Sequence, residues 1–364
     1  MNWRTRGRER QAYSYAYDYL DRLRSAVYAD VNDAGTVTTN SRYNESLTYA
    51  DARGNISNLK RVGGQLSGTC WNFAQIDNLT YAYTAGTNKI SSIADAASAT
   101  YKAKGFNPGG GAGSYAYDVN GNMTTDPYKA MTIAYNHLNL PKLMTFTGGA
   151  QNNTIDILYD AAGTKLRKTV KTGTTVNYYQ DYIGGIEYRD GVREAIYTAE
   201  GRVKYTSPTT TRYEYTIKDH LGNARISFSD LNANGVVNET NVPATNEVLQ
   251  ENHNYPFGLN TEGPWMNDAA LDNKYQYNGK EFNDDFGLNW NDYGARWYDP
   301  ASIVWTSVDP MADDDLLVGW SPYNYVMGNP VKMTDPDGQF PIERDPMGYW
   351  KRSLRCRKGG ISCC

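Results

Sequence analysis

An aromatic pattern that recurs along the first half of the chain constrains the fold more than any other feature. Its clearest copy, residues 115–123, reads Tyr-Ala-Tyr-Asp-Val-Asn-Gly-Asn-Met, and related copies begin at Tyr15, Leu47 and Leu158. Alternation of large and small residues is typical of a half-buried strand, and Asn-Gly supplies the positive φ of a tight turn. Each copy therefore predicts a β-hairpin, which cannot bury its own apolar face. Stacked hairpins can, so the sequence predicts a long antiparallel sheet.

Composition narrows the function classes. The chain has 364 residues and a formal net charge of -4, which gives no indication of nucleic-acid binding. It contains 31 Tyr but only 8 Phe, and such an excess suits short strands whose rings are half buried. No apolar run approaches the roughly 18 residues of a membrane span, and no signal-peptide pattern follows Met1. The repeat pattern is already under way at Tyr15, so we expect the C-terminal piece of a longer protein.

Cysteines and candidate metal ligands are few. Cys70 is isolated, and Cys356, Cys363 and Cys364 lie near the C-terminus without a Cys-x-x-Cys pair or a His cluster. We therefore expect no zinc site, no disulfide framework and no cofactor. Residues 230–235 resemble the start of a calcium loop, but the twelfth position of that loop is an Asn. A turn-rich hairpin loop is the preferred interpretation, and we expect no metal.

A second series of motifs, dense in Gly, Pro, Asn and Asp, occupies the last part of the chain. These blocks are Lys218–Asn223, Ala295–Pro300, Ser307–Pro310, Tyr323–Val331 and Asp335–Gly338. Their order and spacing resemble the RHS-repeat-associated core domain, which ends the shell of RHS/YD-repeat proteins. The upstream hairpin copies resemble YD repeats, and the resemblance extends over about residues 10–339.

The resemblance implies an all-β fold in which stacked antiparallel β-hairpins form a YD-repeat shell. In that family the sheet spirals into a hollow cocoon, and a C-terminal plug region closes it. We expect the hairpin shell over residues 10–177, the core domain with a self-cleavage region over 178–339, and a short variable tail over 340–364. An ordinary antiparallel sandwich with Tyr-rich hairpins is the alternative fold.

The resemblance also implies an aspartyl self-cleavage, at most a single turnover per chain. In the family, two Asp side chains assisted by an Arg cut the chain just after the Asp-Pro-x-Gly block. Carried over position by position, the catalytic residues are Arg296, Asp309 and Asp335, and the cleavage site is Gln339-Phe340. Paired carboxylates share a proton, so one activates water while the other polarises the scissile carbonyl. We expect Arg296 to grip one carboxylate bidentately and lower its pKa.

Two observations weigh against this chemistry. Asp before Pro is common in turns, where its carboxylate simply accepts hydrogen bonds from backbone N–H groups. The family usually has a Gly inside the segment that reads Ser302-Ile303-Val304-Trp305 here, so Arg296 could be placed differently. His220 lies in a turn without a nucleophile motif nearby, and we interpret it as structural.

The preferred function is the C-terminal part of a polymorphic-toxin-type RHS protein. It would enclose a C-terminal cargo and release it by autoproteolysis, with upstream shell repeats and the cargo as partners and a secreted or cell-surface location. The tail over 340–364 is too short to fold alone, and a remnant is preferred over a small disulfide or metal knot. One alternative is a non-enzymatic adhesion scaffold that binds surface glycans. Another is a truncated remnant without a toxin.

Overall fold

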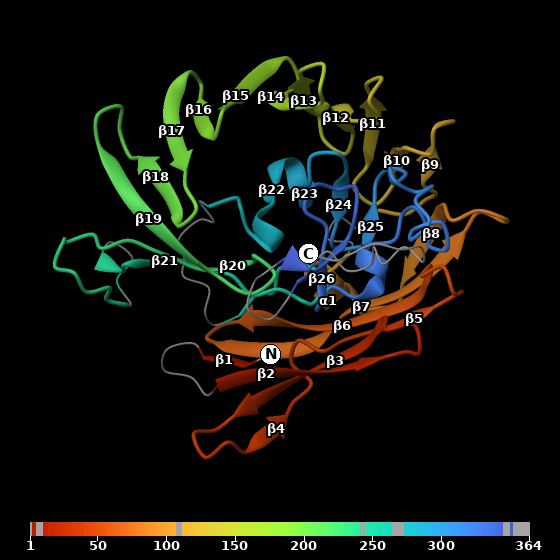
Figure 1. Cartoon of the computed structure of the whole chain (residues 1–364), viewed down its shortest axis with the longest axis horizontal. Coiled ribbons are helices and arrows are strands. Elements are labelled where there is room, and N and C mark those ends of the chain that lie inside the picture. Colours follow the sequence, from red (N-terminus) through yellow and green to blue (C-terminus); the bar gives the residue numbers. More distant parts are fainter. Residues whose placement is uncertain are drawn as a thin grey trace, which may run out of the picture.

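Almost all of the regular secondary structure in the computed structural model belongs to antiparallel sheets (Figure 1). The structure describes residues 2–4, 10–106, 111–240, 242, 245–263, 273–344 and 350–351. Within them the strands form sheets of 8, 13, 4 and 3 strands. The all-β prediction of stacked antiparallel hairpins is therefore confirmed. Among the described residues, no helix has both the length and the apolar content that crossing a bilayer requires.

The first sheet contains the N-terminal hairpins, in the order β1-β2-β3-β5-β6-β7-β8, with β4 paired to β3. Its strands are β1 (Asn2–Arg4), β2 (Arg10–Tyr17), β3 (Leu23–Val31), β4 (Val37–Thr39), β5 (Glu45–Tyr49), β6 (Ile56–Ser67), β7 (Cys70–Tyr83) and β8 (Ile90–Asp95). The short helix α1 (Ala99–Lys102) follows β8 and packs against β7. Almost every strand pairs with its neighbour in sequence, as short hairpin connections require.

The second sheet is one uninterrupted meander from β9 to β21. Its strands are β9 (Ala116–Tyr117), β10 (Met123–Asp126), β11 (Met131–Tyr135), β12 (Pro141–Phe146), β13 (Asn153–Tyr159), β14 (Lys165–Thr172), β15 (Thr175–Ile183), β16 (Ile186–Arg189), β17 (Val192–Tyr197), β18 (Gly201–Tyr205), β19 (Thr211–Lys218), β20 (Ala224–Phe228) and β21 (Val248–Glu251). The sheet bends into an arc above the flatter first sheet (Figure 1). The predicted boundary after residue 177 falls inside β15, and the domain limits stay predictions.

One turn geometry explains the Asp that recurs in the hairpin motif. Oδ1 of Asp118 accepts hydrogen bonds from the N–H groups of Asn120 and Asn122. Gly121, which lies between these two residues, has a φ of 85°. An Asp or Asn makes the same pair of bonds, to the second and fourth residues after it, in the turns that begin at Asp18, Asp51, Asn136, Asp160 and Asp219. The carboxylate thus satisfies turn N–H groups that the ladder leaves unpaired.

A Tyr that ends the strand before a turn links neighbouring hairpins. The hydroxyl of Tyr49 donates to the Leu23 carbonyl at 2.9 Å, and Tyr83 donates to Ile56 at the same distance. Each acceptor is the first residue of a strand that follows an earlier turn. The same link recurs from Tyr135 to Met123 and from Tyr159 to Pro141. Because the ring lies in the core and the hydroxyl reaches a backbone carbonyl, Tyr suits this position better than Phe.

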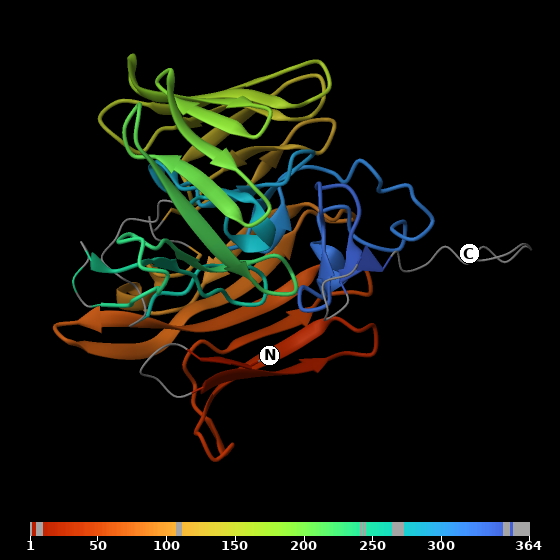
Figure 2. The same cartoon turned by 60° about the vertical axis from the view of Figure 1, so that its left-hand side comes forward.

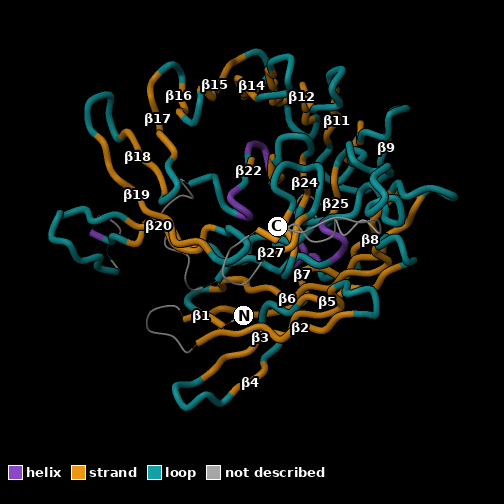
Figure 3. The backbone as a smooth tube through the Cα atoms, viewed as in Figure 1, coloured by secondary structure: helices purple, strands orange, loops and turns teal. Residues whose placement is uncertain are grey.

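The C-terminal segment lies between the two large sheets (Figures 1 and 2). Most of it consists of turns and loops (Figure 3), with the small sheets β22 (Glu281–Asn283), β23 (Trp290–Asp292), β24 (Trp297–Asp299), β25 (Val304–Trp305), and β26 (Met333–Thr334), β27 (Ile342–Arg344), β28 (Trp350–Lys351). Single 3₁₀ turns occupy Tyr277–Gly279, Asp285–Gly287 and Val326–Gly328. The buried rings of this segment pack with residues of both large sheets in one apolar cluster, so they form the centre of the core.

Arg61 attaches this segment to the first sheet. It is 0% exposed and lies 2.7 Å from Glu45 and 3.1 Å from Asp77. Its guanidinium also donates to the carbonyls of Pro300 at 3.0 Å and Ala301 at 2.8 Å. These bonds join β6 to the loop after β24, more than two hundred residues away in sequence.

The loop that resembles a calcium site, residues 230–235, and the four cysteines were also subjects of sequence predictions. Both oxygens of Asp230 accept backbone N–H groups of its own loop, and those of Glu247 do the same. The loop is therefore held by hydrogen bonds of the kind the turn interpretation predicts, and no group of three or more potential metal ligands occurs in the described part. Cys70 is exposed and unpaired. Cys356, Cys363, Cys364 and Asn241 lie outside the described residues.

Candidate functional site

The three residues carried over from the motif comparison meet at one buried point. Nη2 of Arg296 lies 2.6 Å from Oδ2 of Asp309 and 3.2 Å from Oδ2 of Asp335. Arg296 and Asp335 are each 1% exposed and Asp309 is 9% exposed. Arg296 immediately precedes β24, Asp309 lies in the turn after β25, and Asp335 directly follows β26. Residues that flank three short strands therefore meet at a single guanidinium.

Arg296 is held by backbone carbonyls and an aromatic ring as well as by the two carboxylates. Its Nε donates to the Gly338 carbonyl at 2.6 Å, and Nη1 donates to the Pro322 carbonyl at 3.2 Å. The guanidinium lies 4.1 Å from the centre of the Trp305 ring. The expected bidentate grip on one carboxylate is not what the structure has, because a single nitrogen bridges both. Three donors engage backbone and carboxylate at once, so the group has little freedom to move.

In each Asp, the carboxylate oxygen that does not contact Arg296 accepts hydrogen bonds within a turn. Oδ1 of Asp335 accepts the N–H groups of Gly338 at 2.8 Å and Gln339 at 3.1 Å. Oδ1 of Asp309 accepts the Met311 N–H at 2.8 Å. The turn-capping role that was the alternative to catalysis is therefore present. It occupies one oxygen of each carboxylate and leaves the other oxygen on Arg296.

Burial dominates the electrostatics of the site. It raises the pKa of Asp309 and of Asp335 above the ordinary value, against the opposing effects of Arg296 and of backbone donors. Burial also lowers the pKa of Arg296 itself. We expected Arg296 to lower the pKa of one carboxylate, but the cost of desolvation is larger than that attraction. Raised carboxyl pKa values favour the protonated form, and two neighbouring carboxyl groups can share one proton.

A small cavity adjoins the three side chains. Its volume is about 20 Å³, and its walls include Arg296, Asp309, Asp335, Trp305 and Pro341. A polar cavity of roughly 10–15 Å³ or more is large enough for one water molecule, which needs two to four polar partners. The carboxylate and guanidinium atoms supply such partners beside the chain that follows Gln339.

The peptide units around the predicted cleavage site differ in their bonding. The unit between Gly338 and Gln339 is gripped at both ends, its carbonyl by Arg296 and its N–H by Asp335. Within the described residues, neither the Gln339 carbonyl nor the Phe340 N–H has a hydrogen-bond partner. The predicted scissile unit is therefore the first one beyond the gripped peptide.

Two neighbours of the site were absent from the sequence prediction. Lys280 contacts the Pro336 carbonyl through Nζ, and Trp305 stacks on the guanidinium. Both lie in the C-terminal segment outside the motif blocks named above, and no spacing rule connects them to the Asp residues. His220, interpreted as structural, contacts the Val331 carbonyl at 3.1 Å through Nε2.

The missing Gly of residues 302–305 has a visible consequence. Ile303 has φ 60°, a left-handed conformation that is strained for a β-branched residue. Its side chain is 3% exposed within the main core cluster, so burial offsets the strain. Arg296 keeps its contacts to both Asp residues despite this substitution.

Comparison with known proteins supports an RHS-type relationship. No protein-family model matches the chain. The tRNA3(Ser)-specific nuclease WapA of Bacillus spizizenii is 27% identical over 241 residues, which cover 62% of this chain and 9% of WapA. The toxin subunit YenC2 of Yersinia entomophaga is 34% identical over 99 residues, 26% of this chain and 9% of YenC2. The chain thus spans only about a tenth of these relatives.

Solved structures show the same fold. The Photorhabdus luminescens Tc holotoxin pore, with an Asp-to-Ala mutation in TccC3, superposes with a TM-score of 0.63 at 18% identity and covers 92% of this chain and 15% of that one. A crystal structure of TcdB2-TccC3-Cdc42 gives a TM-score of 0.61, again at 18% identity, over 91% of this chain and 16% of that one. At this identity the likeness establishes the antiparallel β-architecture alone.

Proposed function

We propose that this chain is the C-terminal part of an RHS-type, polymorphic-toxin-like protein and that it cuts itself between Gln339 and Phe340. The observation that carries the proposal is the contact of Arg296 with both Asp309 and Asp335, beside a water-sized cavity and an unbonded peptide unit. A purely structural Asp-Pro turn needs neither a shared guanidinium nor a second buried carboxylate. The motif resemblance supplies the same three residues independently.

The proposed reaction is a hydrolysis by one water molecule. The ionised carboxylate takes a proton from the water as its oxygen attacks the carbonyl carbon of Gln339. The protonated carboxylate donates its proton to the carbonyl oxygen, which gives a neutral tetrahedral intermediate. Collapse of the intermediate breaks the C–N bond. The nitrogen of Phe340 takes the proton that the first carboxylate received from water, and one hydroxyl group of the intermediate returns a proton to the other carboxylate. The products are a carboxyl group on Gln339 and a free amine on Phe340.

Arg296 would serve as a positioning residue. Its bond to the Gly338 carbonyl fixes the chain just before the scissile unit, and its contact with both carboxylates holds them around the cavity. Because the substrate is part of the same chain, no binding step is required, and modest catalysis is enough for one turnover.

We further propose a shell role for the β-structure. The relatives are several times longer, and we infer that upstream shell repeats continue the first sheet beyond β1 and that a cargo attaches after the cleavage site. A secreted or cell-surface location follows from this proposal. The curvature of the meander around the C-terminal segment supports enclosure (Figure 1).

The intact mass of the purified chain tests the cleavage. We expect the parent to lose the 25 residues from Phe340 to Cys364, and Asp309→Asn and Asp335→Asn to keep them. Asp337→Asn is the matched control, because Asp337 lies in the same turn without an ion pair to Arg296 and should still be cut. A mass one residue shorter would place the cut after Gly338 instead. Full-length mass in the parent and every variant would refute the cleavage and favour a non-enzymatic scaffold.

A further inference from the structure

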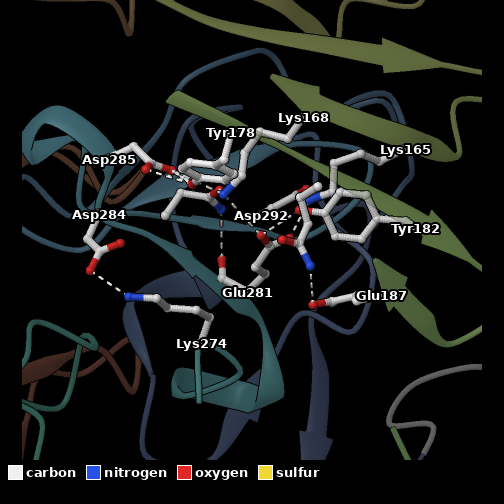
Figure 4. Close-up of polar contacts among 12 residues, drawn as sticks. Lys165, Lys168, Tyr178, Tyr182, Glu187, Lys274, Glu281, Asp284, Asp285 and Asp292 are labelled. Atoms are coloured by element: carbon white, nitrogen blue, oxygen red, sulfur yellow. Dashed lines mark hydrogen bonds and ion pairs between the residues drawn. The ribbon is translucent and has the colours of Figure 1, made fainter. Parts of the chain in front are cut away.

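A cavity of about 510 Å³ lies away from the Asp pair, between β15–β18 and the chain that begins at Asn273. Its walls include Lys165, Tyr182, Glu187, Tyr197, Asn273 and Tyr275. This volume falls in the range typical of small-ligand sites, which combine apolar walls with a few convergent polar groups. Figure 4 shows the polar side chains that meet on this side of the sheet.

Glu187, on β16, is 9% exposed and makes no ion-pair contact with a Lys or Arg among the described residues. Its carboxylate accepts hydrogen bonds from the Tyr275 hydroxyl at 2.7 Å, from Gln180 Nε2 at 3.0 Å and from the Tyr197 hydroxyl at 3.4 Å. The neighbouring Glu281, Glu194 and Glu214 each contact a Lys or Arg. Glu187 is therefore a buried acid served only by neutral donors.

The charge network behind the cavity contains more acids than bases. Lys165 pairs with Glu281 and Asp292, and Lys168 contacts Glu281 and Asp285 (Figure 4). Three carboxylates thus face two ammonium groups before Glu187 is counted. A buried excess of negative charge is stabilised by an additional cation and destabilised by an anion.

The aromatic walls suit a cation as well. The rings of Tyr197 and Tyr275 are tilted against each other with centroids 4.5 Å apart. On the Tyr182 ring, the ammonium of Lys165 already lies 4.4 Å from the centroid. Tyrosine faces attract ammonium groups through the ring quadrupole, so the walls add to the attraction of the carboxylate.

We propose that this cavity binds an alkylammonium group, such as the end of a lysine side chain or a free alkylamine, with Glu187 as its counter-ion and Tyr197 and Tyr275 as its walls. A neutral sugar would use the same rings but would not relieve the excess of carboxylates. The site does not depend on self-cleavage, because none of its walls belongs to the Asp pair.

Saturation-transfer NMR on the full chain carrying Asp309→Asn tests the proposal. n-Butylammonium should bind saturably, whereas n-butanol and butyrate at the same concentration should not. Glu187→Gln should weaken butylammonium binding at least tenfold. Glu194→Gln is the matched control, because Glu194 faces the same side of the sheet but is paired with Lys204, and it should bind normally.

Further variants and ligands test the aromatic wall and distinguish a protein side chain from a free amine as the ligand. Tyr197→Phe should keep binding and Tyr197→Leu should weaken it, which tests the wall without changing charge. Binding of Nα-acetyl-lysine methylamide as well as butylammonium would support a protein side chain as the ligand, and binding of butylammonium alone would support a free amine. Equal binding by butanol, unchanged binding in Glu187→Gln, or binding of methyl β-D-glucopyranoside in place of the amines would overturn the proposal.

Discussion

Replacement of Arg296 by Met should destabilise the chain strongly in a pH-dependent way. The change removes the only side-chain cation that contacts Asp309 and Asp335 in the described structure, and it leaves both carboxyl groups buried. It also removes the donors to the carbonyls of Gly338 and Pro322. Loss of one partner from a buried ion pair costs about 3–5 kcal/mol, so we expect a loss of that size at pH 8.

The sign of the pH dependence follows from the carboxyl groups. Burial already raises the pKa of Asp309 and of Asp335, and removal of the guanidinium raises both further. The folded variant then holds more protons than the unfolded chain, so its free energy of unfolding falls as the pH rises. The deficit should therefore be largest at pH 8 and should shrink towards pH 5, as the carboxyl groups take up protons.

Urea unfolding at pH 5 and pH 8 measures this effect. Asp309→Asn is the reference, because it should be uncleaved and it keeps Arg296. Arg296→Met should also remain full length by intact mass, whereas a second substitution, Asp335→Asn, should restore part of the stability at pH 8. A deficit below about 1 kcal/mol at pH 8, the size of a surface ion pair, would refute the buried-counter-ion reasoning.

Two other predictions concern charged groups away from the Asp pair. Burial and the nearby Glu281 raise the pKa of Glu187 from 4.5 to about 7, so folding favours its protonated form. The stabilisation is complete below pH 4.5 and is lost as the pH rises towards 7. At about 1.4 kcal/mol per pKa unit, this change is about 3 kcal/mol, and urea unfolding of Glu187→Gln should lack it; an unchanged pH slope would contradict this assignment. Arg61→Met should cost about 3–5 kcal/mol and reduce self-cleavage, because Glu45 and Asp77 lose their counter-ion and the loop after β24 loses its anchor. Unfolding and intact mass measure both effects, and a stable variant that still cuts itself would show that Arg61 does not position the segment.

Local chemistry made much of the fold predictable. The Tyr-x-Tyr-Asp pattern predicted hairpins because its Asp bonds to N–H groups only two and four residues away, as Asp118 does. Such bonds depend on neighbours in sequence, so the pattern carries them with it. The same locality explains why the block at Asp219 forms one more turn of this kind. The arc that the hairpins make together was an expectation from family resemblance, not from the residues.

The candidate site was predictable as a set of residues but not as a geometry. The family resemblance pointed to Arg296, Asp309 and Asp335, and the structure brings their side chains together. The resemblance did not indicate that one nitrogen of Arg296 bridges both Asp residues. It also did not indicate that desolvation affects their pKa values more than the attraction of the guanidinium does. Burial depends on the whole core around the site, and no local pattern encodes it.

By itself, the sequence determined the hairpin units, their turns and the residue types available for chemistry, because these follow from bonds between near neighbours. Only the tertiary structure decided which distant groups meet. Arg61 binds the Pro300 carbonyl, and Glu187 meets Tyr275 across a cavity, although no spacing links either pair. The physical reason is that packing of the sheets around the C-terminal segment sets burial and long-range contact together, and with them the charge state of each buried group.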